Sequence, residues 1–315
     1  MKKLGILTLL FCVSPMVYAQ AVGSAVVKSS DVEMTLNSAA KGTVIASGSC
    51  GENVNYELYD DYTLRIFGKG AMYNYKNNCD NSANKDVTSA PWGAKIKAVV
   101  IDDGVTRIGA LAFLGCSSLS EVTIPNSVTC IGKDAFDGCS ALTKINIHNS
   151  VIFIEDGALG NCNSLVEVNL SSNIKTISSF LLKNCGSIEN IKIPNSVTSI
   201  ERYAFEGCSS LKEIKIPNSV TNIEDHAFSG CDKMKYITFG ESVKNISIQA
   251  FPQNNDEDLV IEITSETPAA LRGGQMHSVS SALSMCQKTR LKLISMLSFG
   301  RIMQIRLSQR NIQQE

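Results

Sequence analysis

The sequence predicts an α/β repeat solenoid. We expect short strands, returns that are mostly irregular or made of 3₁₀ or short helix, and a β-rich cap at the N-terminal end. The first observation behind this prediction is a cysteine that returns every 23 residues within a chain of 315. The second is a set of apolar positions that return with it. A fixed period in this range is typical of solenoids, in which each unit buries its apolar side against its neighbours. The cysteines are Cys116, Cys139, Cys162, Cys185, Cys208 and Cys231.

Residues 1–19 have the form of a secretory signal peptide. Lys2 and Lys3 give a basic start, an apolar run extends from Leu4 to Val13, and Ala19 is a small residue before the expected cleavage point. A short membrane anchor is the alternative, but the apolar run is too short to cross a bilayer. We therefore expect an exported protein, secreted or held at the cell surface, with no transmembrane span.

A linker and a cap are expected before the repeats. Residues 20–42 are small and polar and predict a linker, whereas residues 43–92 predict a β-rich cap. In the cap, Tyr56-x-Leu58 and Leu64-x-Ile66 alternate with period two, and Asp60-Asp61 between them predicts a turn. A solenoid needs such a cover over its first apolar end. We expect Trp92, the only tryptophan, to pack beneath the first unit.

Residues 93–253 contain seven units of 23 residues, which we call rungs, and the first lacks its cysteine. Six and eight residues after each cysteine stand apolar side chains, as in Val122-x-Ile124, which predict a short strand with both side chains inward. The following Pro-Asn-Ser, as at 125–127, ends the strand. A Val-x-x-Ile step then gives a second apolar edge, and residues 132–138 predict one or two turns of helix or 3₁₀. Residues 254–283 offer a final strand and a C-terminal flank.

The repeated frame C-x-x-L-x-x-[IV]-x-[IL]-P-x-x-[VI]-x-x-I-x-x-x-A-F resembles the BspA-like (Treponema-type) leucine-rich repeat. The match is close over residues 93–253 and looser from about residue 43. The resemblance implies a curved solenoid on a secreted or surface protein, commonly an adhesin or binding scaffold. Enzymatic activity is not part of what it implies. Residues 43–92 resemble the family's N-terminal cap, which ends in Pro-Trp as Pro91-Trp92 does here.

Residues 284–315 form an atypical basic tail, with no acidic residue until the last position. A basic amphipathic helix and a disordered segment are two interpretations. A third is a frameshift. Back-translation of residues 284–312 with permitted codons, shifted by two bases, gives a stretch that begins Tyr-Val-Pro and is rich in aromatic residues. That stretch resembles the family's C-terminal cap. Sequencing the coding DNA across codons 280–290 tests this hypothesis, and an intact frame that encodes the written protein would refute it.

The composition predicts no catalytic residue, no metal site and no cofactor. The three histidines have no partners that the repeat would place beside them, no C-x-x-C occurs, and a 23-residue spacing does not suit metal ligands. We expect the recurring cysteines to be reduced, buried thiols, although bridges between neighbouring rungs and a Cys50–Cys79 bridge stay open. Cys130, outside the series, is expected at the surface or in a groove.

The surface that remains for binding is the outward row of each strand, five and seven residues after the cysteine. We predict a binding strip there for a protein or glycan ligand at the cell surface. The formal net charge of −1 argues against a nucleic-acid partner, and we expect a monomer. A structural envelope component, or a hydrolase with its site in the cap or tail, are the alternatives. The predicted strip comprises Glu121, Thr123, Lys144, Asn146, Glu167, Asn169, Asn190, Lys192, Glu213, Lys215 and Tyr236.

Overall fold

The structure, a computed structural model, describes residues 42–75, 90–240, 242–247 and 249–252. It also describes the backbone of three later strands, β19 (Val260–Ile263), β20 (Lys292–Leu297) and β21 (Arg301–Gln304). The chain divides into two units, Met1–Lys41 and Gly42–Glu315, and every described residue belongs to the second. The predicted signal peptide, the linker up to Lys41, Cys79 and most of the basic tail lie outside the described residues.

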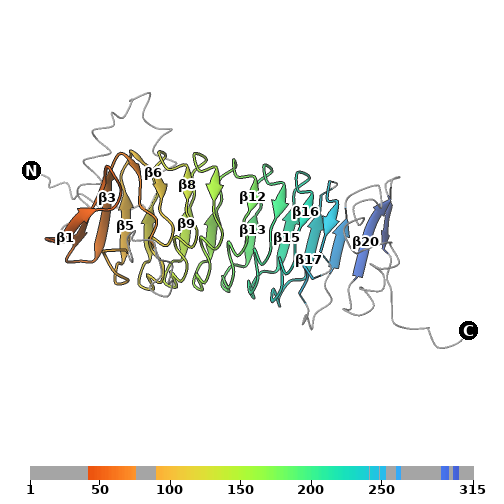
Figure 1. Ribbon diagram of the computed structural model, residues 1–315. Helices are drawn as coiled ribbons and strands as arrows, with labels where there is room; N and C mark the ends of the chain where they lie inside the picture. Colours follow the sequence, from red (N-terminus) through yellow and green to blue (C-terminus); the bar gives the residue numbers. More distant parts are fainter. Residues whose placement is uncertain are drawn as a thin grey trace, which may run out of the picture. The chain divides into compact units, whose positions relative to one another are not determined.

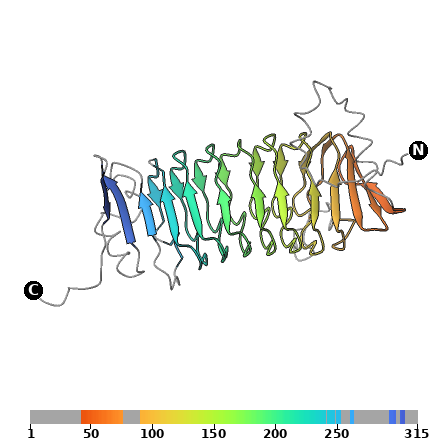
Figure 2. The same cartoon turned by 180° about the vertical axis from the view of Figure 1, so that it is seen from behind.

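The second unit is a β-solenoid in which equivalent short strands of successive rungs stack in parallel (Figures 1 and 2). One column of strands, the ribbon, is formed by the strands that follow each cysteine. Its equivalent residues pair in register, as Ile191 with Ile214 and Ile214 with Ile237. The ribbon strands are β5 (Ala98–Ile101), β7 (Glu121–Thr123), β9 (Lys144–Asn146), β11 (Glu167–Asn169), β13 (Asn190–Lys192), β15 (Glu213–Ile216) and β17 (Tyr236–Phe239).

A second column of strands follows the Pro-Asn-Ser turns or their equivalents. It is built from the Val-x-x-Ile steps, and its isoleucines pair from rung to rung, as Ile200 with Ile223. These strands are short because only two residues of most rungs enter the ladder. They are β6 (Val105–Ile108), β8 (Cys130–Ile131), β10 (Phe153–Ile154), β12 (Thr176–Ile177), β14 (Ser199–Ile200), β16 (Asn222–Ile223) and β18 (Asn245–Ile246).

The interior is the single apolar core that the repeat predicts. In β7 the side chains of Glu121 and Thr123 are exposed while Val122 turns inward, so the period-two pattern is confirmed. The recurring cysteines are buried free thiols in one file. Each donates to a main-chain carbonyl of the preceding rung, as Cys139 Sγ does to Phe113 O at 3.3 Å and Cys185 Sγ to Leu159 O at 3.1 Å.

The expected helical returns are wrong, and so is the α/β class: the described residues contain strands and turns but no helix. In the return 132–138, Asp134 has φ 50° and Gly138 has φ 75°, in the left-handed region that interrupts a right-handed helix. Alternate amides then bond to the next rung, as Phe136 N does to Ala158 O at 2.9 Å. The intervening amides close local turns, as Asp137 N does to Asp134 O. Stacking therefore satisfies amides that a helix would have paired internally.

The N-terminal segment begins both columns. Strands β1 (Val44–Ser49), β2 (Val54–Tyr59) and β3 (Thr63–Gly68) are antiparallel neighbours, and β3 pairs in parallel with β5. The short β4 (Gly70–Ala71) pairs with β6 and begins the second column. Trp92 is buried, stacks on Phe113 with ring centroids 5.7 Å apart, and donates Nε1–H to Ala112 O at 3.0 Å. Its predicted place beneath the first rung is confirmed.

Beyond the last complete rung the ribbon continues. Strand β19 pairs in parallel with β17, which confirms the predicted strand near Ile261 and Ile263. Strands β20 and β21 follow in the same sheet, the second antiparallel to the first. Both lie within the basic tail, so the described parts of that tail are strands and not an amphipathic helix.

Candidate binding surface on the strand ribbon

The ribbon exposes every residue of the predicted binding strip. Because each strand turns its apolar residue inward, the residues on either side of it point outward, and all of the predicted side chains are exposed. Their in-register pairing places equivalent residues of neighbouring rungs side by side, as Asn190, Glu213 and Tyr236 on β13, β15 and β17. A second row runs parallel to the first through Lys192, Lys215 and Thr238.

The structure gathers only part of this strip into a groove. A depression of about 840 Å³ lies over β13, β15 and β17. Its lining includes five of the predicted residues, namely Asn190, Lys192, Glu213, Lys215 and Tyr236. The other predicted residues lie on β7, β9 and β11, outside this groove. We call the depression the ribbon groove.

Sequence reasoning missed the wall of the ribbon groove. Asn195, Pro217, Asn218 and Ser219 also line it, and they come from the turns that follow β13 and β15. The Pro-Asn-Ser motif carried the missing signal, since a turn that ends each strand must lie beside that strand's outer face. The motif thus both ends the strand and forms the wall of the groove.

The charges on the ribbon differ between its parts. On β9 and β11, Lys144 lies opposite Glu167, and their charged groups form an ion pair of 2.8 Å. This ion pair lowers the pKa of the Glu167 carboxyl, chiefly through its hydrogen bond from Lys144. On β13 and β15, by contrast, Lys192 lies opposite Lys215. Neither lysine forms an ion pair within the part of the chain that the structure describes.

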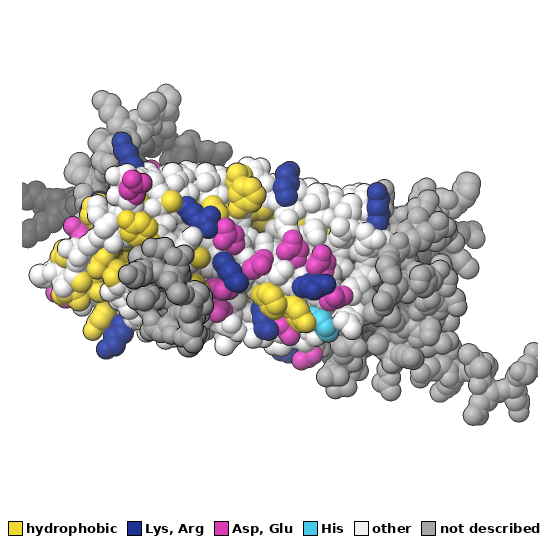
Figure 3. All heavy atoms as spheres, viewed as in Figure 1, with side chains coloured by type: hydrophobic (Ala, Val, Ile, Leu, Met, Phe, Trp, Pro, Cys, Tyr) yellow, Lys and Arg dark blue, Asp and Glu magenta, His cyan; other side chains and the backbone are white. Residues whose placement is uncertain are grey.

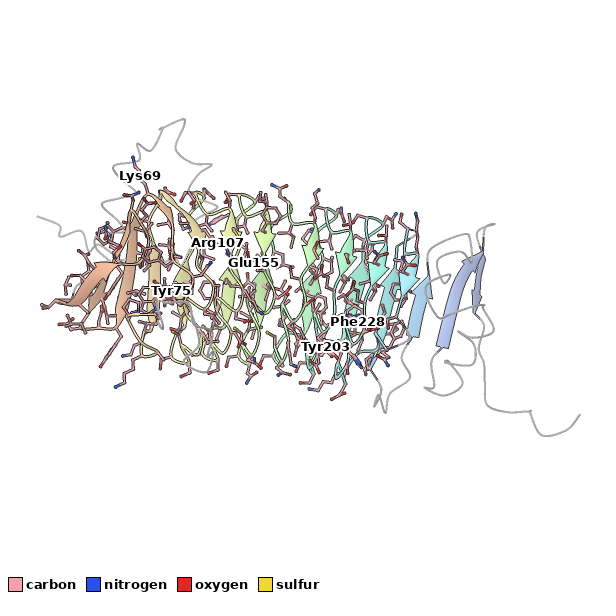
Figure 4. All side chains as sticks on the ribbon, in the orientation of Figure 1. Lys69, Tyr75, Arg107, Glu155, Tyr203 and Phe228 are labelled. Carbon is pink, nitrogen blue, oxygen red and sulfur yellow. The ribbon has the colours of Figure 1, made fainter. Side chains whose placement is uncertain are left out.

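A second groove of about 470 Å³ lies on the other column of strands. Arg107 and Glu155 point toward one another there (Figure 4) and pair at 2.9 Å. Arg107 Nη1 also lies 2.9 Å from Cys130 Sγ. Cys130 was expected at the surface or in a groove, and it lines this one while being mostly buried. Burial is the main cause that raises the pKa of its thiol, so the group is held as a neutral thiol and not as a nucleophile.

The recurring thiols are also unsuited to nucleophilic catalysis and to metal binding. Burial raises the pKa of Cys116 and of Cys162 to about 12, and it raises the pKa of Cys185 and Cys208 well above the ordinary value. Protonated, buried thiols are poor nucleophiles and poor metal ligands. Within the described residues no three His, Cys, Asp or Glu side chains are grouped to hold a metal ion, and no helix could cross a bilayer.

An aromatic stack on the returns was also missed. Phe180, Tyr203 and His226 stand at the same place in successive rungs, with neighbouring ring centroids 4.9 Å apart and the rings within 10° of parallel. The Lys183 ammonium lies 5.4 Å from the Phe180 centroid. The equal 23-residue spacing of the three rings was visible in the sequence. On the face shown in Figure 3, basic and acidic side chains are interspersed, without a large patch of one sign.

Comparison with known proteins gives one family. The profile described as BspA type Leucine rich repeat region (6 copies) matches residues 92–212 and 175–267. No curated protein matches the chain.

Solved structures of repeat proteins are similar as well. A leucine-rich repeat protein from Bacteroides ovatus is 24% identical with a TM-score of 0.48, over 69% of this chain and 65% of that one. This chain thus spans just under two thirds of that relative. The T. pallidum Leucine Rich Repeat protein is 26% identical with a TM-score of 0.45, over 74% and 92% of the two chains. A leucine rich cell surface protein from Faecalibacterium prausnitzii is 22% identical with a TM-score of 0.39, over 73% and 82%.

Proposed function

Since this chain belongs to the BspA-type leucine-rich repeat family, we propose that it is an exported, non-enzymatic scaffold that binds a protein or glycan at the bacterial cell surface. The observation that carries the proposal is the ribbon groove, a depression of about 840 Å³ that is lined mainly by polar and charged residues on the continuous part of the ribbon. Solenoids offer extended surfaces of this kind to ligands. The strands that line the groove are fixed in the stack by their ladder hydrogen bonds, so a partner has to order side chains but not backbone when it binds.

Export is part of the same proposal. The signal-peptide pattern of residues 1–19 supports it, and we expect the processed protein in the medium or on the cell surface as a monomer. Fractionation of the producing cells, with detection by an antibody, locates the protein. Recovery in the cytoplasm with residues 1–19 still attached would overturn this part.

Binding is tested with the full processed chain against immobilised extracellular-matrix proteins and an array of surface glycans. Asn190→Trp places a bulky side chain in the ribbon groove and should reduce binding at least tenfold. Lys175→Trp is the matched control, because Lys175 is exposed and lines the second groove. Loss of binding in Lys175→Trp but not in Asn190→Trp would move the site to the other column of strands. Absence of any ligand for the wild-type chain would favour a structural role in the envelope.

A further inference from the structure

We propose that the ribbon groove binds an acidic saccharide, with its carboxylate or sulfate between Lys192 and Lys215 and a sugar ring on Tyr236. This inference rests on the proposed function and adds the chemical class of the ligand. Without a ligand, the groove holds two lysines of like charge side by side, which is unfavourable. Neighbouring strands lie about 4.8 Å apart, and like charges directly opposite one another are destabilising.

The lysine pair lacks the compensation found elsewhere on the same face. Lys144 has Glu167 opposite it, and Lys212 pairs with Glu189 at 2.7 Å. Lys192 and Lys215 are opposite each other, exposed, and without an ion pair to any described residue. An anion between the two ammonium groups would replace a repulsion by two attractions. The groove therefore offers a specific place for a negative group.

The other side chains suit a hydroxylated ligand. Tyr236 is 53% exposed and stands beside Glu213 in the row next to that of the two lysines, so a ligand in the groove can contact its ring. Glu213 can accept hydrogen bonds from hydroxyl groups, and the Asn190 and Asn195 amides can both donate and accept them. Sugars need this combination, because they present apolar C–H faces and hydroxyl edges.

Ser219 offers a ligand in the groove one further polar group. Two of its counterparts in other rungs donate to the preceding rung, Ser127 Oγ to Val105 O at 2.8 Å and Ser196 Oγ to Ile174 O at 2.6 Å. A third counterpart, Ser150, lies outside the groove and has a buried hydroxyl without a described partner, as Ser219 does. The Ser219 hydroxyl is buried and has no partner among the residues that the structure describes. A buried hydroxyl without a partner is costly, and a ligand in the groove that it lines would supply one.

An acidic peptide fits the groove less well. Peptides bind sheets mainly by adding a strand to a free edge, but β15 and β17 are paired on both sides. Strand β13 ends the ladder, yet β11 of the preceding rung lies beside its other edge. An amphipathic helix would need a row of apolar anchors, and Tyr236 is the only large aromatic side chain that lines the groove. The observations thus favour a saccharide over a peptide.

The test uses the full processed chain and three immobilised probes of defined chemistry. Hyaluronan carries carboxylates, heparin carries carboxylates and sulfates, and dextran is neutral. We expect the wild-type chain to bind one or both acidic polymers and not dextran, and to bind several-fold more weakly when salt is raised from 50 to 300 mM, because salt screens exposed charges. Lys192→Glu with Lys215→Glu should reduce binding at least tenfold, and Tyr236→Ala several-fold.

The matched control is Lys175→Glu with Lys244→Glu, which makes the same change in net charge at exposed positions outside the groove. It should retain wild-type binding. Addition of the acidic polymer should raise the melting temperature of the wild-type chain and of this control, but not that of the groove variant. This second readout separates lost binding from lost folding.

Three results would overturn the inference. Equal loss in the control variant would show attraction by net charge alone, and stronger binding of poly-glutamate than of either acidic polymer would identify a peptide ligand. Binding of a neutral ligand that Asn190→Trp abolishes but the lysine variant leaves intact would refute the acidic saccharide while leaving the proposed function standing. Failure of the proposed function looks different, because Asn190→Trp would then have no effect on any ligand.

Discussion

The rungs at 139–184, the central rungs, and those at 185–239, the C-terminal rungs, share one repeat but are connected differently. Around the central rungs the ribbon is interrupted twice, between β7 and β9 and between β11 and β13, and the second column is interrupted between β10 and β12. In the C-terminal rungs both columns are continuous, through β13, β15 and β17 in the ribbon and through β14 and β16 in the second column, which also joins β12 before them and β18 after them. The ribbon groove lies on the continuous part.

The sequence supplies a physical cause. The central ribbon strands β9 and β11 are three residues long and end in Asn146 and Asn169, and asparagine is unfavourable in strands. In the C-terminal rungs β13 is also three residues long and begins with Asn190, but β15 and β17 are four residues long and contain more β-branched and aromatic side chains. In the core, Phe205 and Phe228 stack at 5.6 Å in the C-terminal rungs, where the central rungs have Leu159 and Leu182.

The returns remain continuous across the whole described stack. Gly157 N donates to Ser179 O at 2.9 Å and Leu159 N to Leu181 O at 3.1 Å, so the central rungs keep in the returns the connection that they lose in the sheets. The returns and the core therefore hold the rungs together in both regions. The continuity of the sheets determines where the outer surface is regular enough to form a groove.

The largest expected difference between the two regions is in the core. Phe205→Ala should lower the free energy of unfolding by about 3–5 kcal/mol, because it removes a fully buried ring and its stacking partner's contact. Leu182→Ala, equally buried in the central rungs, should cost less, toward the lower end of about 2–5 kcal/mol, because it removes a smaller side chain. Urea unfolding of both variants measures the difference. A greater loss for Leu182→Ala would reverse our view of which region is better packed.

The free energy of unfolding at alkaline pH tests whether the thiols of the central and of the C-terminal rungs are equally buried. The folded pKa of Cys162 is about 12, above its ordinary value of 9.0, so its stabilising contribution is complete below pH 9 and is lost as the pH rises toward 12. One pH unit above 9 costs about 1.4 kcal/mol for each such thiol. Cys162→Ala and Cys208→Ala should each flatten the alkaline decline in unfolding free energy, because burial raises the pKa of both thiols. A flattening for Cys208→Ala alone would mean that the central thiol is not sealed from solvent.

A smaller effect is expected on the central strands. Asn146→Thr should raise the free energy of unfolding by a few tenths to about 1 kcal/mol and slow amide exchange in β9, because threonine favours strands. The reverse change at the equivalent position of β7, Thr123→Asn, serves as the control and should destabilise by a similar amount. Unchanged exchange in both variants would exclude strand propensity as the cause of the interrupted ribbon.

The smallest effect concerns the ion pair of the central ribbon. The pKa of Glu167 should lie below that of an ordinary glutamate, and Lys144→Met should return it upward. Because the folded pKa is lowered, the contribution of this carboxylate is present at neutral pH and is lost as the pH falls through the folded pKa. Carbon-detected NMR titration of the side-chain carboxyl measures both values. An unshifted pKa of Glu167 in the wild-type chain would show that Lys144, like Lys192, has no ion-pair partner in solution.

Periodic signals in the sequence predicted the stack, the buried thiols, the outward row and the place of Trp92. They could do so because inward and outward positions follow directly from strand geometry. The returns were predicted wrongly, since their amides bond to another rung and Asp134 and Tyr203 adopt positive φ, neither of which a local pattern reveals. The repeat also placed Lys192 and Lys215 at one offset of successive rungs, and they do lie opposite each other. The boundaries of the ribbon groove escaped prediction, because they depend on which neighbouring strands pair, and the 23-residue spacing is the same for every rung.

The one-way donation of the returns has an evolutionary consequence. Phe113, Phe136 and Phe205 each give an amide proton to the rung that follows, and the receiving carbonyl always occupies the same place in its own rung. Duplication or deletion of a whole multiple of 23 codons therefore preserves the hydrogen bonds between neighbouring rungs. An insertion of another length in a return would displace the acceptor carbonyl and leave the amide of the preceding rung without it. Gene duplication or deletion can thus change the length of the solenoid while the contacts between its rungs stay the same.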